Sequence, residues 1–149
     1  MTHPLAFRIA TEQDIPLLAQ MNKDLIKDEG HSNPMSVEQL AQRMMGFLSG
    51  GYGAVLFEQG GIVVAYALYR SDDDGIYLRH FFVRRDCRRH GLGQAAMAIL
   101  LDDVWPQNAR ITVEVLTDNV AGRAFWSSIG FIPYSLALEM TPEMRSSRR

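Results

Sequence analysis

The chain has 149 residues, of which 47% are hydrophobic and 21% are charged, and its formal net charge is −2. These values fit one globular domain with its own core, and the small charge argues against a general nucleic-acid binder. The only cysteine, Cys87, has no partner for an internal disulfide. No apolar run is long enough to span a membrane and the N-terminus lacks a secretory signal pattern, so we expect a cytoplasmic protein.

The first half of the chain predicts a strand, two helices and a hairpin. Apolar residues alternate at 5–9, which is typical of a short strand with one buried face. Helices are expected at 14–28 and 36–48, because apolar residues recur there on one stripe. Two strands, at 53–58 and 62–69, are joined by a pair of glycines, and this spacing indicates a hairpin.

The second half of the chain alternates strands with helices. Its two strands before and after the first helix must be parallel, because the connection between them is a helical crossover. The expected elements are a strand at 76–83, a helix at 94–105, a strand at 111–116, a helix at 120–128 and an extended strand at 131–140.

The complete order is β-α-α-β-β-β-α-β-α-β, which predicts an α/β fold with a mixed sheet and helices on both faces. The sequence contains no internal repeat or linker. We therefore expect a single domain over residues 1–149, with a flexible polar tail at 141–149.

A glycine-bearing turn at residues 88–93 joins the strand 76–83 to the following helix. The first turn of a helix has amide groups without partners, and the helix dipole adds partial positive charge there. Gly91 and Gly93 remove the Cβ atoms that would keep a ligand away from those amides. With three basic side chains just upstream, the turn predicts a binding site for a pyrophosphate.

Two motifs at this turn and beyond it resemble the GNAT superfamily of acetyl-CoA-dependent N-acyltransferases. Residues 88–93 match the acetyl-CoA motif Gln/Arg-x-x-Gly-x-Gly/Ala, after a strand that ends in Val83. Residues 119–131 match a second motif, which begins with an asparagine and ends in a Gly-Phe pair. The resemblance covers nearly the whole chain in element order and implies a GNAT-like fold for a single N-acetyltransferase domain.

The resemblance also implies where coenzyme A binds. The backbone amides of the turn would bind the pyrophosphate, the backbone of the strand end would pair with pantetheine at a bulge, and Asn119 would hydrogen-bond the pantetheine arm. Acetyl-CoA is then the acetyl donor. The expected donor site comprises Phe82, Val83, Arg88, Arg89, His90, Gly91, Leu92, Gly93, Gln94 and Asn119.

Transfer to an amine needs a group that takes a proton, since an alkylammonium has a pKa of about 10.4. Glu114 is the candidate general base, because similar ribosomal-protein N-terminal acetyltransferases have a matching Glu-Val…Asn arrangement; the alternative is a strand residue in a salt bridge. Many family members have a tyrosine as general acid where this chain has Trp126. Either the thiolate leaves without an acid, or Tyr134 or Tyr77 serves, although both are also candidates for packed aromatics.

In family members the segment between the first two helices lines the acceptor site. Here it contains Asp28, Glu29 and His31, and we add Tyr77 from the strand 76–83 to this set. Acidic residues suit a cationic amine, whereas the alternative is a solvated helix end. We expect a small-molecule amine as the acceptor, rather than a protein N-terminus, and direct transfer in a ternary complex by a monomer or homodimer.

Two other readings compete with this enzyme. A degenerate member would bind acyl-CoA as a sensor, and the tryptophan at the acid position motivates that alternative. A nucleotide binder of another kind lacks support, since no Walker-type lysine and serine or threonine follow Gly93. The four histidines show no metal-ligand spacing, so we expect no metal site and no nucleic-acid or membrane partner.

Overall fold

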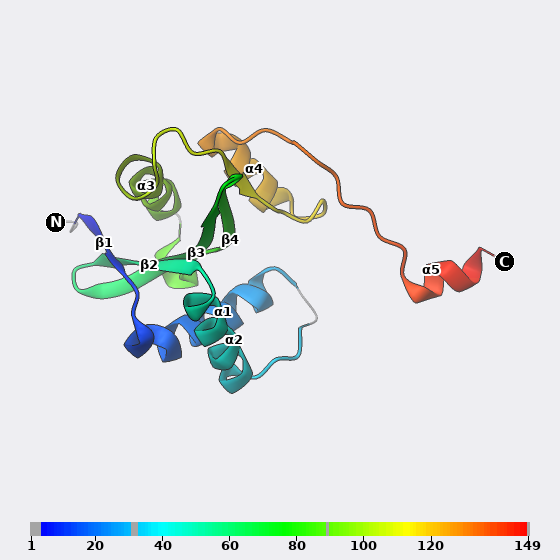
Figure 1. The fold of residues 1–149 in the computed structure, drawn as a ribbon, viewed down its shortest axis with the longest axis horizontal. Helices are drawn as coiled ribbons and strands as arrows, with labels where there is room; N and C mark the ends of the chain where they lie inside the picture. The colour runs from blue at the N-terminus through cyan, green and yellow to red at the C-terminus, as the bar shows by residue number, and fades with distance from the viewer. Residues whose placement is uncertain (1–3, 31–32, 89, 149) are drawn as a thin grey trace.

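Five strands form one mixed sheet in the described part of the chain, residues 4–30, 33–88 and 90–148 of this computed structural model (Figure 1). The strands follow their chain order across the sheet. The first four pair antiparallel, and the last pair is parallel, as the helical crossover predicts. The strands are β1 (Leu5–Ile9), β2 (Tyr52–Gln59), β3 (Ile62–Asp72), β4 (Gly75–Val83) and β5 (Ile111–Val113).

Helices cover both faces of this sheet, with α1 and α2 on one side and α3 and α4 on the other (Figure 1). The capping box expected at the start of the second helix is present, since the Ser36 side chain accepts a hydrogen bond from the Gln39 amide. The helices are α1 (Ile15–Asp28), α2 (Val37–Ser49), α3 (Leu92–Ile99) with a π-helical continuation over Leu100–Val104, α4 (Val120–Ile129) and α5 (Pro142–Ser147).

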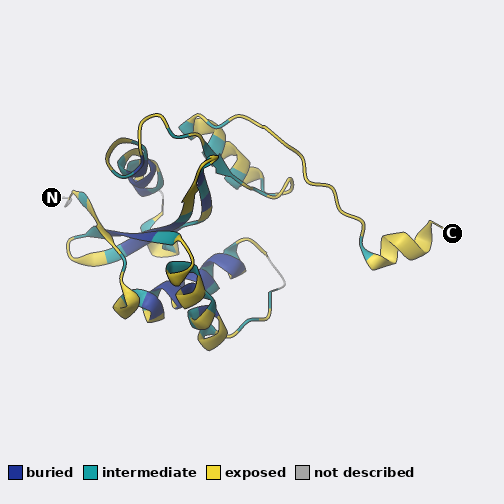
Figure 2. Ribbon diagram, in the orientation of Figure 1, coloured by how far each residue is buried: buried dark blue, intermediate teal, exposed yellow. Residues whose placement is uncertain are grey.

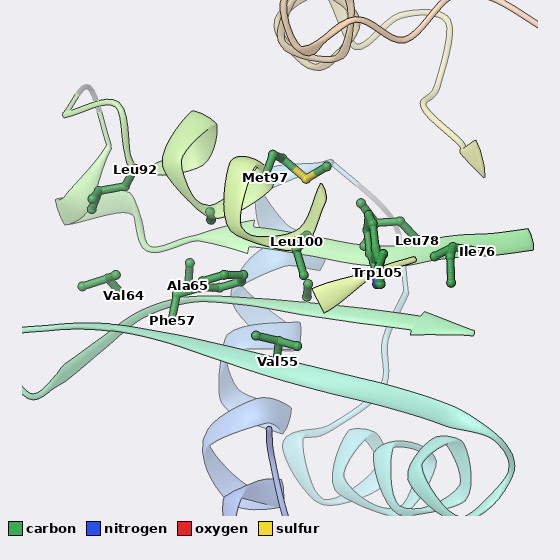
Figure 3. Close-up of a cluster of buried hydrophobic side chains, with 12 residues drawn as sticks. Val55, Phe57, Val64, Ala65, Ile76, Leu78, Leu92, Met97, Leu100 and Trp105 are labelled. Atoms are coloured by element: carbon green, nitrogen blue, oxygen red, sulfur yellow. The ribbon is translucent and has the colours of Figure 1, made fainter. Parts of the chain in front are cut away.

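Alternating residues of the central strands face two separate cores. In β2, Val55 and Phe57 pack on the α3 side, whereas Leu56 packs against α1 and α2. Figure 3 shows the core on the α3 side, where Leu100 and Trp105 close over the strands. Figure 2 shows that burial is concentrated along the inner strands and α1. Each fully buried aliphatic side chain contributes about 2 kcal/mol, so these cores hold the sheet rigid.

The parallel pair at the end of the sheet separates after a short contact. β5 pairs with β4 only where Ile111–Val113 lie beside Ile76–Leu78, and β4 continues to Val83. Beyond Leu78, the edge of β4 that faces β5 has no strand partner among the described residues. In open α/β sheets such a gap at the carboxyl ends of parallel strands is where ligands bind.

The C-terminal region departs from two expectations. Residues 132–140, the C-terminal arm, are extended but belong to no strand, and they leave the body of the molecule (Figure 1). The predicted strand at 131–140 is therefore wrong in this structure, because no neighbouring strand supplies its hydrogen bonds. The polar tail forms α5, whose start is capped by Thr141 and has Pro142 in its first turn.

No helix in the described ranges is long and apolar enough to cross a membrane. The expectations of a cytoplasmic location and of a single domain over 1–149 stay predictions.

Candidate active site

The turn between β4 and α3 has the geometry of an anion site. Gly91 is the N-cap of α3 and has a φ of 70°, a left-handed conformation that glycine adopts without strain. The first hydrogen bond of the helix runs from the Ala95 amide to the Gly91 carbonyl at 3.0 Å, so the amides of Leu92, Gly93 and Gln94 precede the ladder. No atom lies within 4 Å of a Cβ built on Gly91. The open space and the free amides therefore fit a phosphate group.

Gly93 has a different function, because it lets two helices approach closely. A Cβ at this position would lie 3.0 Å from Cε1 of Phe125 on α4. The side chain of His90 is exposed at the mouth of the turn, and Arg89 lies outside the described residues. Backbone amides and glycines thus line the turn, and basic side chains lie at its edge.

Arg88 links the turn to α1. Its Nε donates to the Val83 carbonyl at 2.9 Å, and its guanidinium forms an ion pair with Asp28, which also accepts from Arg85 at 2.8 Å. Burial alone would raise the pKa of Asp28, but the hydrogen bonds from both arginines outweigh burial and lower that pKa. Phe82 and Asp28 also line a pocket of about 450 Å³ between α1 and the end of β4.

Asp28 was predicted to contact the acceptor, and in the structure its carboxylate pairs with Arg88 of the phosphate turn and with Arg85, which precedes that turn. Glu29 is exposed next to the end of α1, and His31 lies outside the described residues. One carboxylate of the acidic segment is thus paired with arginines, and the acceptor contacts expected of this segment stay predictions.

Glu114 and Tyr77 meet at the point where β4 and β5 separate. The Tyr77 hydroxyl donates to Oε1 of Glu114 at 2.7 Å. Glu114 follows the last residue of β5 rather than lying within it, since β5 is shorter than the predicted strand 111–116. Burial, together with this hydrogen bond, raises the pKa of Tyr77 to about 12. Tyr77 therefore keeps its proton at neutral pH and orients one oxygen of an exposed carboxylate.

The bulge in β4 lies earlier than expected. Phe82 and Val83 pair in regular register with Tyr66 and Ala65 of β3, and the register shifts at Arg79. The placement of the bulge at Phe82 and Val83 is therefore wrong, because apolar residues on both faces of a strand do not indicate where its ladder is interrupted. Both residues still lie beyond the part of β4 that pairs with β5, and the Val83 carbonyl there accepts the hydrogen bond from Arg88 Nε.

Asn119 begins α4 and accepts a hydrogen bond from the Gly122 amide at 2.9 Å through Oδ1, which leaves its Nδ2 group to donate elsewhere. Trp126 packs in an aromatic cluster, with its ring centroid 5.6 Å from Phe81 and 5.4 Å from Phe131. Its position in this cluster is that of a packing residue.

Tyr134 is not brought to the Tyr77–Glu114 pair. It is 79% exposed at the root of the arm, and the guanidinium of Arg110 stands 4.5 Å from its ring centroid. Arg110 precedes the first residue of β5, whereas Glu114 follows the last one. The two catalytic candidates thus lie toward opposite ends of that strand.

Sequence reasoning missed a group of side chains beside this pair, which we call the arginine–tyrosine cluster (Tyr52, Arg70, Tyr77 and Arg79). The guanidinium of Arg70 lies 5.4 Å from the Tyr77 ring centroid, and Arg70 and Arg79 both donate to the Tyr52 hydroxyl at 3.4 Å. Arg70 pairs with Asp72 at 3.2 Å, whereas Arg79 has no carboxylate partner within the described ranges. The signal in the sequence that could have revealed this cluster is Arg79, a charged residue inside the otherwise apolar strand 76–83.

A partly buried histidine follows Arg79 on β4. His80 Nδ1 is 3.1 Å from the Tyr66 hydroxyl, and burial, with Arg43 and Arg79 nearby, lowers the pKa of His80 to about 3. The imidazole is therefore neutral at physiological pH. Across the residues with described positions, no group of three or more His, Cys, Asp or Glu side chains could hold a metal ion.

Comparison with known proteins agrees with this geometry. The family model of the acetyltransferase (GNAT) family matches residues 18–131. A search of curated proteins found no match.

Similar solved structures share the fold at low sequence identity. A predicted acetyltransferase from Clostridium acetobutylicum, solved with acetyl-CoA, has a TM-score of 0.72 at 18% identity, covering 92% of this chain and 96% of that one. The aminoglycoside N-acetyltransferase AAC(6')-Iy, solved with CoA, has a TM-score of 0.73 at 12% identity, with 95% of each chain covered. A ribosomal-protein-alanine N-acetyltransferase from Brucella melitensis biovar Abortus 2308 also has a TM-score of 0.73 at 12% identity, covering 92% of this chain and 99% of that one.

The family match extends from α1 to the Gly-Phe pair after α4, and it includes the phosphate turn, Glu114 and Asn119. The chain therefore belongs to the GNAT family of acetyltransferases, and it is an acyltransferase whose acetyl donor is acetyl-CoA.

Proposed function

We propose that this enzyme transfers acetyl directly from acetyl-CoA to the primary amine of a small molecule, with Glu114 as the general base. The observation that carries this proposal is the position of Glu114, a hydrogen-bonded but exposed carboxylate at the gap between β4 and β5. Two of the similar structures are solved with acetyl-CoA and CoA, and they support acetyl-CoA as the donor.

The donor would be held mainly by backbone groups. The amides of Leu92, Gly93 and Gln94 fit its pyrophosphate, and the free edge of β4 offers hydrogen bonds to pantetheine. Arg88 brings positive charge to the rim, and Asn119 retains a donor for the pantetheine arm. Held in this way, the thioester would lie beside the end of β4, near Glu114.

Glu114 would then take the proton that the attacking amine loses. As the new C–N bond forms, the C–S bond of the thioester breaks and coenzyme A leaves as a thiolate. A thiol has a pKa of about 8.5, so the thiolate leaves without help from a stronger acid. Tyr77 is unsuited to protonate it because the pKa of Tyr77 is raised to about 12, and we assign Tyr77 the positioning of Glu114.

The acceptor would carry a carboxylate or another anion near its amine, as amino acids do. The arginine–tyrosine cluster adjoins Glu114 through Tyr77, and Arg79 has no carboxylate partner in the part of the chain that is described. Polyamines and aminoglycosides are polycations, which two guanidinium groups would repel. An acceptor with a carboxylate would bring the anionic partner that Arg79 lacks, and Arg79 would contact that carboxylate.

The base assignment is tested with Glu114→Gln, which keeps the shape of the side chain and removes its proton acceptor. We expect kcat to fall by about 100-fold, with an unchanged KM for acetyl-CoA, in an assay of thiol release over a range of pH. Glu143→Gln on α5 is the matched control and should match the wild type. An unchanged rate and pH profile for Glu114→Gln would remove Glu114 from this role.

The acceptor class is tested with pairs of amines that differ only by a carboxylate. We expect kcat/KM to be at least about 10-fold higher for amino acids than for the corresponding amines, and Arg79→Gln should abolish the difference. Equal rates on both members of each pair would contradict the acceptor class. Tight acetyl-CoA binding without turnover on any amine would contradict the transfer itself, and turnover on peptide N-termini alone would favour a protein substrate.

A further inference from the structure

Asp28 is the last residue of α1, and its carboxylate joins this helix to the segment between β4 and α3. Oδ1 of Asp28 accepts a hydrogen bond from Arg85 at 2.8 Å, and Oδ2 pairs with Arg88. These partners lie 57 and 60 residues further along the chain. The Asp28 side chain is only 15% exposed, so water screens these ion pairs less than it would on an open surface. One carboxylate thus holds two arginines beside the phosphate turn.

Three contacts fix the side chain of Arg88. Its Nε donates to the Val83 carbonyl at 2.9 Å, and its guanidinium carbon lies 5.5 Å from the Phe82 ring centroid. Its Nη2 group forms the ion pair with Asp28. A long side chain at a protein surface otherwise samples many rotamers. Among the described residues, Nη1 of Arg88 has no hydrogen-bond acceptor, so its N–H groups are left to bind an anion such as a phosphate.

We propose that Asp28 is a positioning residue for the donor, because it fixes Arg88 so that the Nη1 group contacts the pyrophosphate of acetyl-CoA. This inference rests on the proposed binding of that pyrophosphate at the amides of residues 92–94. Arg88 begins the turn that leads to these amides. An arginine that is held in place before the ligand arrives loses less conformational entropy on binding. Arg85 holds the other oxygen of the carboxylate and so fixes the orientation of Asp28.

Charge alone predicts the opposite effect of Asp28 on the donor. A carboxylate near the pyrophosphate repels it, so removing that negative charge would strengthen donor binding. Positioning predicts weaker binding instead, because an unpaired Arg88 would no longer be held at the turn. The direction in which the dissociation constant changes therefore distinguishes the two effects.

Calorimetric titration of the full chain tests the proposal with two donors. Acetyl-CoA has the pyrophosphate, and S-acetylpantetheine, measured by competition, lacks it. Asp28→Asn should raise the Kd of acetyl-CoA about 10-fold and leave that of S-acetylpantetheine unchanged. Asp24→Asn is the matched control, since Asp24 lies one turn earlier on α1, lines the same pocket and forms no ion pair in the described part of the chain. It should bind both donors as the wild type does.

A second variant separates position from charge. Arg88→Lys keeps the positive charge but cannot contact Val83 and Asp28 at once, so it should weaken acetyl-CoA binding as Asp28→Asn does. An equal loss for both donors in Asp28→Asn would show that Asp28 only supports the fold, and unchanged or tighter acetyl-CoA binding would also refute the positioning role.

The same titrations need no acceptor amine, so their outcome is independent of Glu114. If the wild type prefers acetyl-CoA and Asp28→Asn retains the whole preference, only the role of Asp28 falls. If the wild type binds both donors equally, the assignment of the turn to the pyrophosphate fails, and the role of Asp28 fails with it.

Discussion

Tyr77 donates a hydrogen bond to Glu114, and burial, reinforced by that bond, raises its pKa to about 12. In the mechanism that we propose, a phenol in this state acts through the carboxylate that it holds, rather than by giving up its proton. Many family members have a tyrosine as general acid at the position where this chain has Trp126. In our proposal Tyr77 does not take over that role, because it keeps its proton. At the scale of single residues, the proposed site is thus suited to accepting a proton.

Tyr77→Phe should lower kcat about 10-fold and leave the KM for acetyl-CoA unchanged, because it removes one hydrogen bond to a charged group. Steady-state kinetics with both substrates varied would measure this effect. Tyr69→Phe, on the opposite face of the sheet, is the control and should match the wild type. The double variant Tyr77→Phe/Glu114→Gln should be no slower than Glu114→Gln alone, and additive losses would contradict the positioning role.

The neutral state of His80 makes stability depend on pH. Its pKa in the folded protein is about 3, whereas an unfolded histidine has a pKa of about 6.5, so the unfolded chain binds the extra proton. The contribution is fully present above pH 6.5 and is lost as pH falls from there toward 3. Between pH 7.5 and pH 5.0 we expect a loss of about 2 kcal/mol in the free energy of unfolding from this group.

Urea unfolding of the wild type and of His80→Gln at these two pH values measures that loss. The variant should retain only the part of the pH dependence that comes from carboxylates such as Asp14 and Asp28, whose pKa values are lowered by arginine partners. An equal loss in both proteins would show that His80 does not stay neutral in the fold.

At the scale of elements, the start of α3 combines a left-handed glycine with open space for a ligand. Gly91→Ala should lower the free energy of unfolding by about 1 kcal/mol, since alanine disfavours a φ of 70°. It should also raise the KM for acetyl-CoA, because the added methyl enters the open space above the amides. Gly61→Ala, at a φ of 81° in the β2–β3 hairpin and equally open, is the matched control.

Both glycine variants should lose similar stability in urea unfolding, and only Gly91→Ala should change the KM for the donor. If the two variants shift this KM equally, the turn before α3 has no specific part in donor binding.

Elements with local signals were predictable from the sequence. The Gly60-Gly61 hairpin, the capping box at Ser36 and the glycine turn before α3 each depend on a few adjacent residues, and the structure has all three. These signals also fix the order of elements and hence the fold class. The Thr141-Pro142 start of α5 is a signal of the same kind that went unread.

Features that depend on distant partners were not predictable. The bulge at Arg79 depends on how β3 pairs with β4, and the ion pairs of Asp28 depend on where α1 ends relative to the phosphate turn. The C-terminal arm shows the same limit. Its alternating apolar residues indicate a strand, but they do not indicate which other strand would pair with it. The sequence thus predicts the phosphate turn, whose signal is local, and misses the arginine–tyrosine cluster, whose members come from three strands.

At the scale of the whole molecule, the sheet separates two cores that different helices cover, α1 and α2 on one side and α3 and α4 on the other. The two tryptophans of the chain, Trp105 and Trp126, both pack with the core on the α3 side. The opposite layer, formed by α1 and α2, contains none. Tryptophan fluorescence therefore reports on only one half of this molecule, the half that contains the phosphate turn, whereas Tyr52 and Tyr66 lie with the other core. If the α1–α2 layer loosens first, a fluorescence trace will miss the event and circular dichroism will record it.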